Sequence, residues 1–312
     1  MPKEITHWIL ADRLKRILPP DSLFFRPVRR YPQLFLTGAV APDTPYNYAA
    51  GPRAEKIQCL SNPLHGIGSS CLSPVLDLLK KEDGDEVTLA FSAGVVSHIM
   101  ADTAFHPLVG YYSGLGGIHA GANTRHRLIE TGMDYFFIRD CSHDYSKSLF
   151  RMTGQMEIGT DQLLDLMGAL FRATRTADKR FIRGALHCHR FFQYLFRSRS
   201  AYRIFHFFHT RGLMVPSRVD ALFYPVKLGS RIRFFEQEFT YQDPYTGEKC
   251  RSTMDRLAVS AVDNAARVLD IIEQSSVVQG GNNPVKGQVL NHPDLPLIRP
   301  GYSKERFQWV MS

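Results

Sequence analysis

The stretch Phe91–His106, FSAGVVSHIMADTAFH, decides the fold of this chain. Its three strongly polar residues, His98, Asp102 and His106, recur at intervals of four, so on a helix they lie one above the other on the same face. The other residues are apolar or small, which is typical of a helix at the centre of a core. Two imidazoles and a carboxylate buried there without partners would be strongly destabilising. Metal ions would remove that cost if the rest of the chain supplies further ligands.

Composition and charge indicate an ordinary globular protein. The 312 residues suffice for one large domain or two modest ones, and the net charge of +8 favours anionic partners such as phosphoesters, nucleic acid or acidic lipid. Five scattered cysteines without a CxxC pair argue against a disulfide framework and against a thiolate zinc site. We find no signal-peptide pattern and no run of roughly 18 apolar residues, so we expect a cytoplasmic protein that could be membrane-associated.

Periodicity predicts an all-α fold. Helical patterns cover residues 6–18, 69–81, 86–106, 124–140, 159–175, 178–198, 199–212, 216–236 and 252–274, and a turn or small hairpin is expected at 242–250. Pro107 is expected to end the central helix, with glycine-rich loop at 108–124 and another loop at 43–53. We expect residues 1–145 to form the metal-binding core, residues 146–278 to complete that domain or form an appended one, and residues 279–312 to form an irregular tail.

Further candidate ligands surround the central stretch. His126 and Glu130 are four residues apart on the next predicted helix, and His7, Asp43 and His65 lie nearer the N-terminus. Histidine and carboxylate ligands suit zinc in hydrolytic sites. Two helices with this spacing would offer too many ligands for one tetrahedral ion. The pattern therefore indicates two or three metals, with a carboxylate such as Asp102 bridging.

Several segments together resemble the zinc-dependent phospholipase C / P1 nuclease superfamily, and most closely the branch that includes the N-terminal domain of glycosylphosphatidylinositol-specific phospholipase D. These segments lie in the order of the family: ITHWI at 5–9, LFLTGAVAPD at 34–43, His65, GVVSHIMADTAFHP at 94–107 and HRLIETGMD at 126–134. The resemblance implies a multi-helix bundle with the metal site between central helices, binding two or three zinc ions that hydrolyse phosphodiesters.

The resemblance also implies a division of ligands. The first zinc site would take Asp43, His65, His98 and Asp102; the second would take His106, His126 and Glu130; and the third would take His7 with the bridging Asp102. Asp43 is in addition the candidate catalytic base. In secreted members a processed N-terminal tryptophan completes the third site, whereas here Trp8 follows His7. Asp134 is expected to orient a ligand histidine, and His119 is a weaker candidate for a phosphate contact.

Three functions remain open from the sequence. The leading one is a phospholipase C-type hydrolase acting on phospholipid or another phosphodiester. The alternatives are a P1-type single-strand nuclease, with nucleic acid as its partner, and a non-catalytic helical protein stabilised by metal. The histidines at 187, 189, 206 and 209 fit amphipathic helices better than a second metal site, although their basic aromatic surroundings could contact a membrane peripherally.

Overall fold

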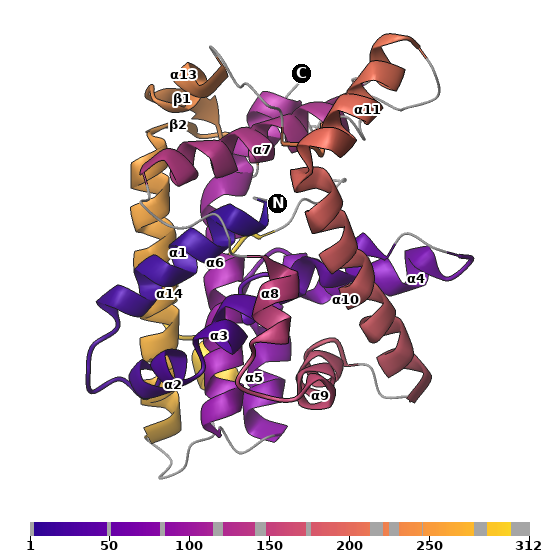
Figure 1. The fold of residues 1–312 in the computed structure, drawn as a ribbon. Helices are drawn as coiled ribbons and strands as arrows, with labels where there is room; N and C mark the ends of the chain where they lie inside the picture. The colour runs from indigo at the N-terminus through magenta and orange to yellow at the C-terminus, as the bar shows by residue number, and fades with distance from the viewer. Residues whose placement is uncertain are drawn as a thin grey trace.

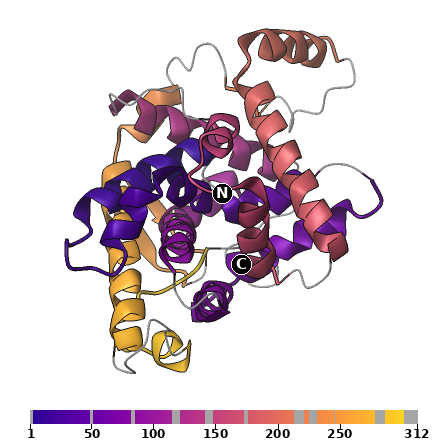
Figure 2. The ribbon, with the colours of Figure 1, turned by 60° about the horizontal axis from the view of Figure 1, so that its bottom comes forward.

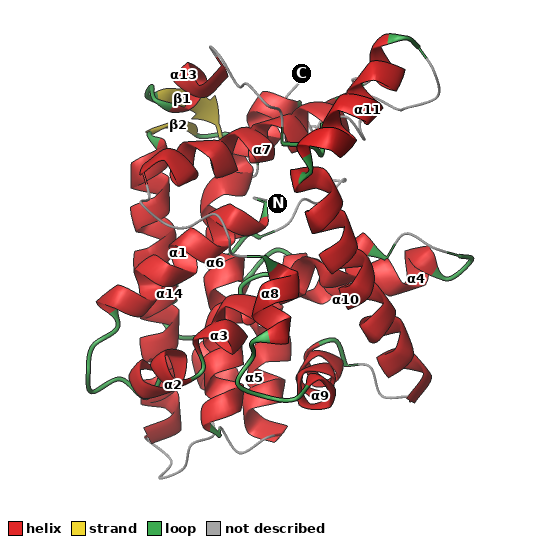
Figure 3. Ribbon diagram, in the orientation of Figure 1, coloured by secondary structure: helices red, strands yellow, loops and turns green. Residues whose placement is uncertain are grey.

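The computed structural model describes residues 3–48, 51–81, 85–114, 121–140, 148–172, 176–212, 221–224, 231–244, 246–277 and 286–300. These residues form an all-α protein whose only described strands make one small hairpin (Figure 3). The elements are α1 (Glu4–Ile17), α2 (Phe25–Arg30), α3 (Pro32–Gly38), η1 (Ala41–Asn47), α4 (Ala54–Gln58), η2 (Cys59–His65), η3 (Ser69–Leu72), α5 (Ser73–Lys81), α6 (Glu86–Ser113), α7 (Ala122–Asp140), α8 (Leu149–Gly154), α9 (Thr160–Leu170), α10 (Thr176–Arg197), α11 (Arg199–Thr210), α13 (Arg231–Phe235), β1 (Phe239–Gln242), β2 (Lys249–Ser252), α14 (Met254–Val277) and α15 (Lys286–Leu290).

Helix α6 is the axis of the molecule. Asp85 caps its first turn by accepting a hydrogen bond from the backbone N–H of Thr88 at 2.7 Å, and Gly114 ends it in the left-handed conformation with φ of 68°. Its most extensive contacts are with α3 and α14, and α1, α2, α5 and α7 also pack against it (Figures 1 and 2). Of the described helices it alone is long and apolar enough to span a membrane, but 83% of its most apolar window is buried inside the protein.

The prediction that Pro107 ends the central helix was wrong. Helix α6 continues through Pro107 to Ser113, so part of the predicted loop at 108–124 is helical. Proline in a helix interior is unfavourable by roughly 3 kcal/mol, through a lost hydrogen bond and a steric clash. Here the added turn is itself buried, with Leu108 and Val109 fully covered, and α6 also packs against β1. Tertiary packing therefore outweighs the local preference.

Other boundaries differ more modestly from the predictions. Part of the expected loop at 43–53 lies in the 3-10 helix η1. Of the predicted helix 216–236, residues 231–235 form α13, residues 221–224 are not helical, and residues 216–220 and 225–230 lie outside the described residues. The hairpin prediction is confirmed, with Phe239 pairing with Ser252 in antiparallel register. His119 lies outside the described residues.

The described residues 286–300 of the predicted tail include a short helix and contacts with the core. Residues 286–290 form α15, the side chain of Ile298 is buried, and its carbonyl accepts a hydrogen bond from the backbone N–H of Gly68 at 2.8 Å. The backbone N–H of Arg299 donates to Thr103 Oγ1 at 3.1 Å, in the middle of α6. Buried apolar residues from Trp8 to Ile298 form one continuous cluster, so most of the described helices share a core.

Candidate metal centre

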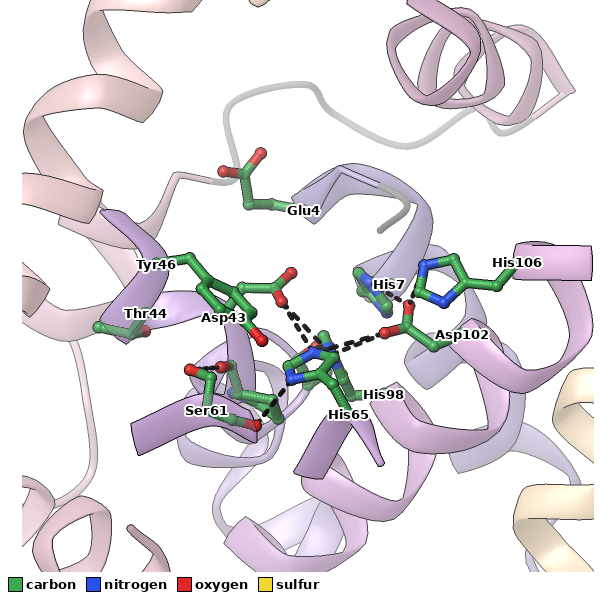
Figure 4. A network of polar contacts seen from close by, with 12 residues as sticks. Glu4, His7, Asp43, Thr44, Tyr46, Ser61, His65, His98, Asp102 and His106 are labelled. Atoms are coloured by element: carbon green, nitrogen blue, oxygen red, sulfur yellow. Dashed lines mark hydrogen bonds and ion pairs between the residues drawn. The ribbon is translucent and has the colours of Figure 1, made fainter. Parts of the chain in front are cut away.

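The eight predicted ligands come from five elements that meet at α6. His7 lies on α1, Asp43 on η1, His65 at the end of η2, three residues on α6, and two on α7. Figure 4 shows the imidazoles and carboxylates from the first four elements pointing toward one another. Ligand atoms fall into three groups, each with its atoms within 4.8 Å of one another: His7, His98 and Asp102; Asp43, His65 and His98; and His106, His126 and Glu130.

Asp102 lies at the centre of the cluster. Its Oδ1 faces His7 Nε2 at 3.5 Å and His106 Nε2 at 3.7 Å, while its Oδ2 faces His98 Nε2 at 3.3 Å and His65 Nε2 at 3.5 Å. The side chain is fully buried, and neither oxygen accepts a hydrogen bond from the described residues. A buried carboxylate without donors is strongly unfavourable by itself. The arrangement fits a carboxylate that would help to hold metal ions together with the surrounding histidines.

A second convergence joins Asp43, His65 and His98. Asp43 Oδ1 lies 3.2 Å from His65 Nε2 and 3.6 Å from His98 Nε2, and the two Nε2 atoms are 3.2 Å apart. Two imidazole nitrogens and a carboxylate oxygen so close together, all directed at one point, present the donor set of a zinc site. His98 takes part in this group and also stacks on His7 with ring centroids 4.1 Å apart. The structure thus places His98 between the first and third sites that the resemblance separates.

The far ring nitrogens of these two histidines are held by the backbone. His65 Nδ1 lies 2.9 Å from the carbonyl of Ser61, and His98 Nδ1 lies 3.0 Å from the carbonyl of Ala39. A carbonyl can only accept, so each Nδ1 carries the proton and each Nε2 keeps its lone pair for the cluster. This is the orientation that a metal-binding histidine requires.

Two glycines place the carbonyl of Ala39. A Cβ built on Gly94 of α6 would lie 2.1 Å from the carbonyl oxygen of Phe35, and one on Gly38 of α3 would lie 2.3 Å from the carbonyl oxygen of Phe91. Helices α3 and α6 therefore touch backbone to backbone, which no larger residue at either position permits. This close approach brings Ala39, the residue after α3, within hydrogen-bonding distance of His98.

The third group lies between α6 and α7. His126 Nε2 and Glu130 Oε1 are 2.6 Å apart, and the rings of His106 and His126 are 6.2 Å apart between centroids. Because α6 continues as a helix past residue 106, His106 lies one turn beyond Asp102 and faces α7. Trp8 is not at the cluster: it is buried in the core and its Nε1 donates to the carbonyl of Leu36 at 3.1 Å.

Burial keeps most of the imidazoles neutral. It lowers the pKa of His7 to about 3 and that of His106 to about 3, and it lowers the pKa of His126 well below its usual value. The pKa of His98 is raised, because Asp102 and Asp43 together outweigh the opposing effect of burial.

The carboxylates are held in the ionised form. Burial alone would raise the pKa of Asp102 and of Asp43, but nearby histidines outweigh it and both pKa values are lowered, that of Asp102 strongly. His106 and His98 contribute most at Asp102, and His98 and His65 contribute most at Asp43. Ionised carboxylates beside mostly neutral imidazoles are the protonation states in which these groups bind metal.

Asp134 has a different role from the one expected. It contacts no ligand histidine directly; its Oδ1 accepts from the backbone N–H of Thr6 at 2.8 Å and from Thr6 Oγ1 at 2.6 Å, and its Oδ2 accepts from the hydroxyl of Tyr224 at 2.5 Å. It therefore fastens the start of α1 to α7, one residue before His7.

His189 is a residue that the sequence pattern did not single out. It is fully buried on α10, with Nε2 3.2 Å from Glu4 Oε1 and Nδ1 3.1 Å from Thr44 Oγ1. It thus links α1 to the residue after Asp43. Nothing in the HxH spacing distinguishes it from the exposed His187, because only the packing of α10 against η1 decides which histidine turns inward.

Fold and site together define a helical protein whose buried histidines and carboxylates form three adjoining groups that could hold metal ions. The chain belongs to the zinc dependent phospholipase C family, whose model matches residues 6–180, more than half of the sequence. The match includes all eight predicted ligands, and the buried nitrogen and oxygen donors fit the zinc on which this family depends. No curated protein and no solved structure shows a significant match.

Proposed function

We propose that this protein is a phospholipase C-type hydrolase that uses two or three zinc ions to cleave the phosphodiester bond of a phospholipid on the diacylglycerol side. The observation that supports it best is the position of Asp102. Its buried Oδ1 faces His7 and His106 and its buried Oδ2 faces His65 and His98, so one carboxylate lies against members of all three ligand groups. A shared carboxylate keeps neighbouring ions close, which is the arrangement that clamps both the attacking and the leaving oxygen of a phosphate.

The cluster has an open side. The side chains of His7, His98 and Asp102 are fully buried, whereas Asp43 and His126 keep 12% and 13% of their surface exposed. A phosphate would therefore reach the cluster at the exposed edges of Asp43 and His126. Tyr46 borders this side, with its ring 5.2 Å from that of His65 (Figure 4).

Asp43 is suited to proton transfer. Its carboxylate is ionised, lies on the open side and is 3.2 Å from His65 Nε2. Zinc, when bound, supplies a Lewis acid for the phosphate oxygens and a nucleophile at neutral pH. In the proposed reaction Asp43 accepts a proton from the attacking water, the bond from phosphorus to the diacylglycerol oxygen breaks, and that oxygen takes a proton from solvent. The products are diacylglycerol and a phosphorylated head group.

The test compares substrates on one zinc-loaded preparation. Zinc content is measured by mass spectrometry, and hydrolysis of phosphatidylcholine and of single-stranded DNA is followed in parallel, with Asp43→Asn beside the exposed control Asp263→Asn. We expect diacylglycerol release that Asp43→Asn abolishes and Asp263→Asn leaves unchanged. Preference for DNA would instead establish the nuclease, and bound zinc without turnover of either substrate would establish a structural role for the metal.

A further inference from the structure

The positive charge of this protein is concentrated in one segment. Residues 179–211 contain eight lysines and arginines and no aspartate or glutamate, so they carry a charge equal to the net +8 of the whole chain. The rest of the sequence is therefore neutral on balance. This segment makes up nearly all of α10 and α11, and all but its first two residues lie beyond the range that the family model matches.

Helix α11 presents an apolar stripe to solvent. Ile204, Phe207 and Phe208 are 56%, 50% and 42% exposed, and their spacing of three and four residues places them on one face. Arg203 and Arg211 are exposed beside this stripe, and the guanidinium of Arg211 lies 4.8 Å from the centre of the Phe207 ring. We call these five residues the α11 face.

The opposite side of α11 fixes the helix to the body. The ring of Phe205 packs on Phe223 with centroids 5.0 Å apart, and Tyr202 also contacts that ring at 6.3 Å. Ser198 caps the helix by accepting a hydrogen bond from the backbone N–H of Ala201 at 3.2 Å. In Figure 2 α11 lies at the edge of the molecule, away from the central helices. Packing on the opposite side of α11 therefore holds the apolar stripe facing solvent.

Helix α10 adds exposed aromatics and a connection to the metal centre. Phe191 and Tyr194 are 58% and 75% exposed, so five of the eleven large apolar side chains exposed among the described residues lie between positions 191 and 208. The same helix packs against η1, which carries Asp43, and buries His189 there. A partner that binds to α10 and α11 would thus contact a helix, α10, that packs directly against the element carrying Asp43.

We propose that the α11 face docks on an anionic lipid surface. Phenylalanine and isoleucine enter the boundary between head groups and acyl chains, while flanking arginines pair with lipid phosphates. Charge complementarity favours this occupant over a second copy of the chain, since two such segments would repel each other. The proposal goes beyond the proposed function, because binding requires no turnover.

The experiment measures binding of the zinc-loaded protein to vesicles of phosphatidylserine with phosphatidylcholine, and to vesicles of phosphatidylcholine alone, by co-sedimentation at low and high salt. We expect Arg203→Gln with Arg211→Gln to weaken binding to the anionic vesicles by about fivefold per arginine. Phe207→Ser with Phe208→Ser should weaken it at least about tenfold. The control Val259→Ser changes an apolar side chain of similar exposure on α14 and should bind as the unmodified protein does.

Two further readouts make the result decisive. Hydrolysis of a monomeric short-chain phospholipid should be the same in all these variants, so a failure of the proposed function would appear there and not in vesicle binding. Equal binding of the α11-face variants and the unmodified protein would overturn the docking proposal. The docking proposal would also be overturned if the unmodified protein did not bind vesicles and instead dimerised, or bound single-stranded DNA tightly, in a way that the same substitutions weaken.

Discussion

Replacing Gly94 with alanine tests whether the contact between α3 and α6 builds the metal centre. The added methyl group would lie 2.1 Å from the carbonyl oxygen of Phe35, 2.8 Å from the backbone nitrogen of Ala39 and 2.9 Å from the carbonyl carbon of Gly38. All three atoms belong to backbone, so no side-chain rotation relieves the overlap. An ordinary contact requires about 3.4 Å, and α3 must therefore move away by more than about 1 Å.

That movement has two separable consequences. Overpacking of this kind typically lowers the free energy of unfolding by roughly 1–3 kcal/mol, and the upper end is expected where backbone meets backbone. The same shift stretches the hydrogen bond from His98 Nδ1 to the Ala39 carbonyl, now 3.0 Å long, beyond useful length. Loss of a hydrogen bond that orients a ligand histidine commonly lowers metal affinity 10–100-fold.

The assay combines urea unfolding of the zinc-free protein with zinc titration against a competing chelator. Gly168→Ala is the matched control, because Gly168 also lies inside a helix, α9, and a Cβ built on it meets nothing within 4 Å. Alanine there should stabilise the protein by up to about 1 kcal/mol. If Gly94→Ala behaved like Gly168→Ala in both measurements, the inferred role of the α3–α6 contact would be refuted.

Three other substitutions probe the surroundings of the centre. Asp102→Asn should release zinc and lower hydrolysis more than about 100-fold, which exceeds the usual effect of removing a residue that only orients a metal ligand. The exposed control Asp263→Asn should change neither zinc content nor hydrolysis. Full zinc content in Asp102→Asn would contradict the bridging role. Burial raises the pKa of Asp134 from 3.8 to about 6, so its stabilising contribution is complete below pH 4 and lost as pH rises through 6. Relative to Asp134→Asn, the unmodified zinc-free protein should lose on the order of 3 kcal/mol of unfolding free energy between pH 4 and 7, and a constant difference would disprove this. His189→Leu should lower the free energy of unfolding by about 2 kcal/mol or more, because Glu4 and Thr44 both lose a hydrogen-bond partner. Equal melting temperatures for His189→Leu and the exposed His187→Leu would argue against a stabilising role for His189.

Local spacing was enough to predict the central features. The four-residue interval from His98 to Asp102 places both side chains on one face of α6, and the same interval brings Glu130 beside His126 on α7. These relations depend only on helix geometry, because residues four apart on any α-helix lie on the same face. The all-α class and the family, which the resemblance of residues 5–134 indicated, are confirmed; the division of ligands among sites stays a prediction.

The remaining features depend on segments far apart in the sequence. Pro107 signals a helix end locally, and only the burial of the following turn reverses that preference. The backbone contact at Gly38 and Gly94 cannot be recognised before the approach of α3 to α6 is known. His189 likewise acquires its role from packing on η1. In each case tertiary contacts supply the deciding free energy, and a single sequence does not state which contacts form.

The position of the C-terminal segment has a consequence for how the protein is made. The carbonyl of Ile298 accepts a hydrogen bond from Gly68, the backbone N–H of Arg299 donates to Thr103 in the middle of α6, and the backbone of Pro300 lies beside the ring of His106. The ribosome must therefore have passed residue 300 before the surroundings of His106 are complete. Until then the ring of His106 lacks this neighbour. Zinc loading should accordingly be a late, post-translational event, and nascent chains stalled before residue 298 should retain the metal poorly.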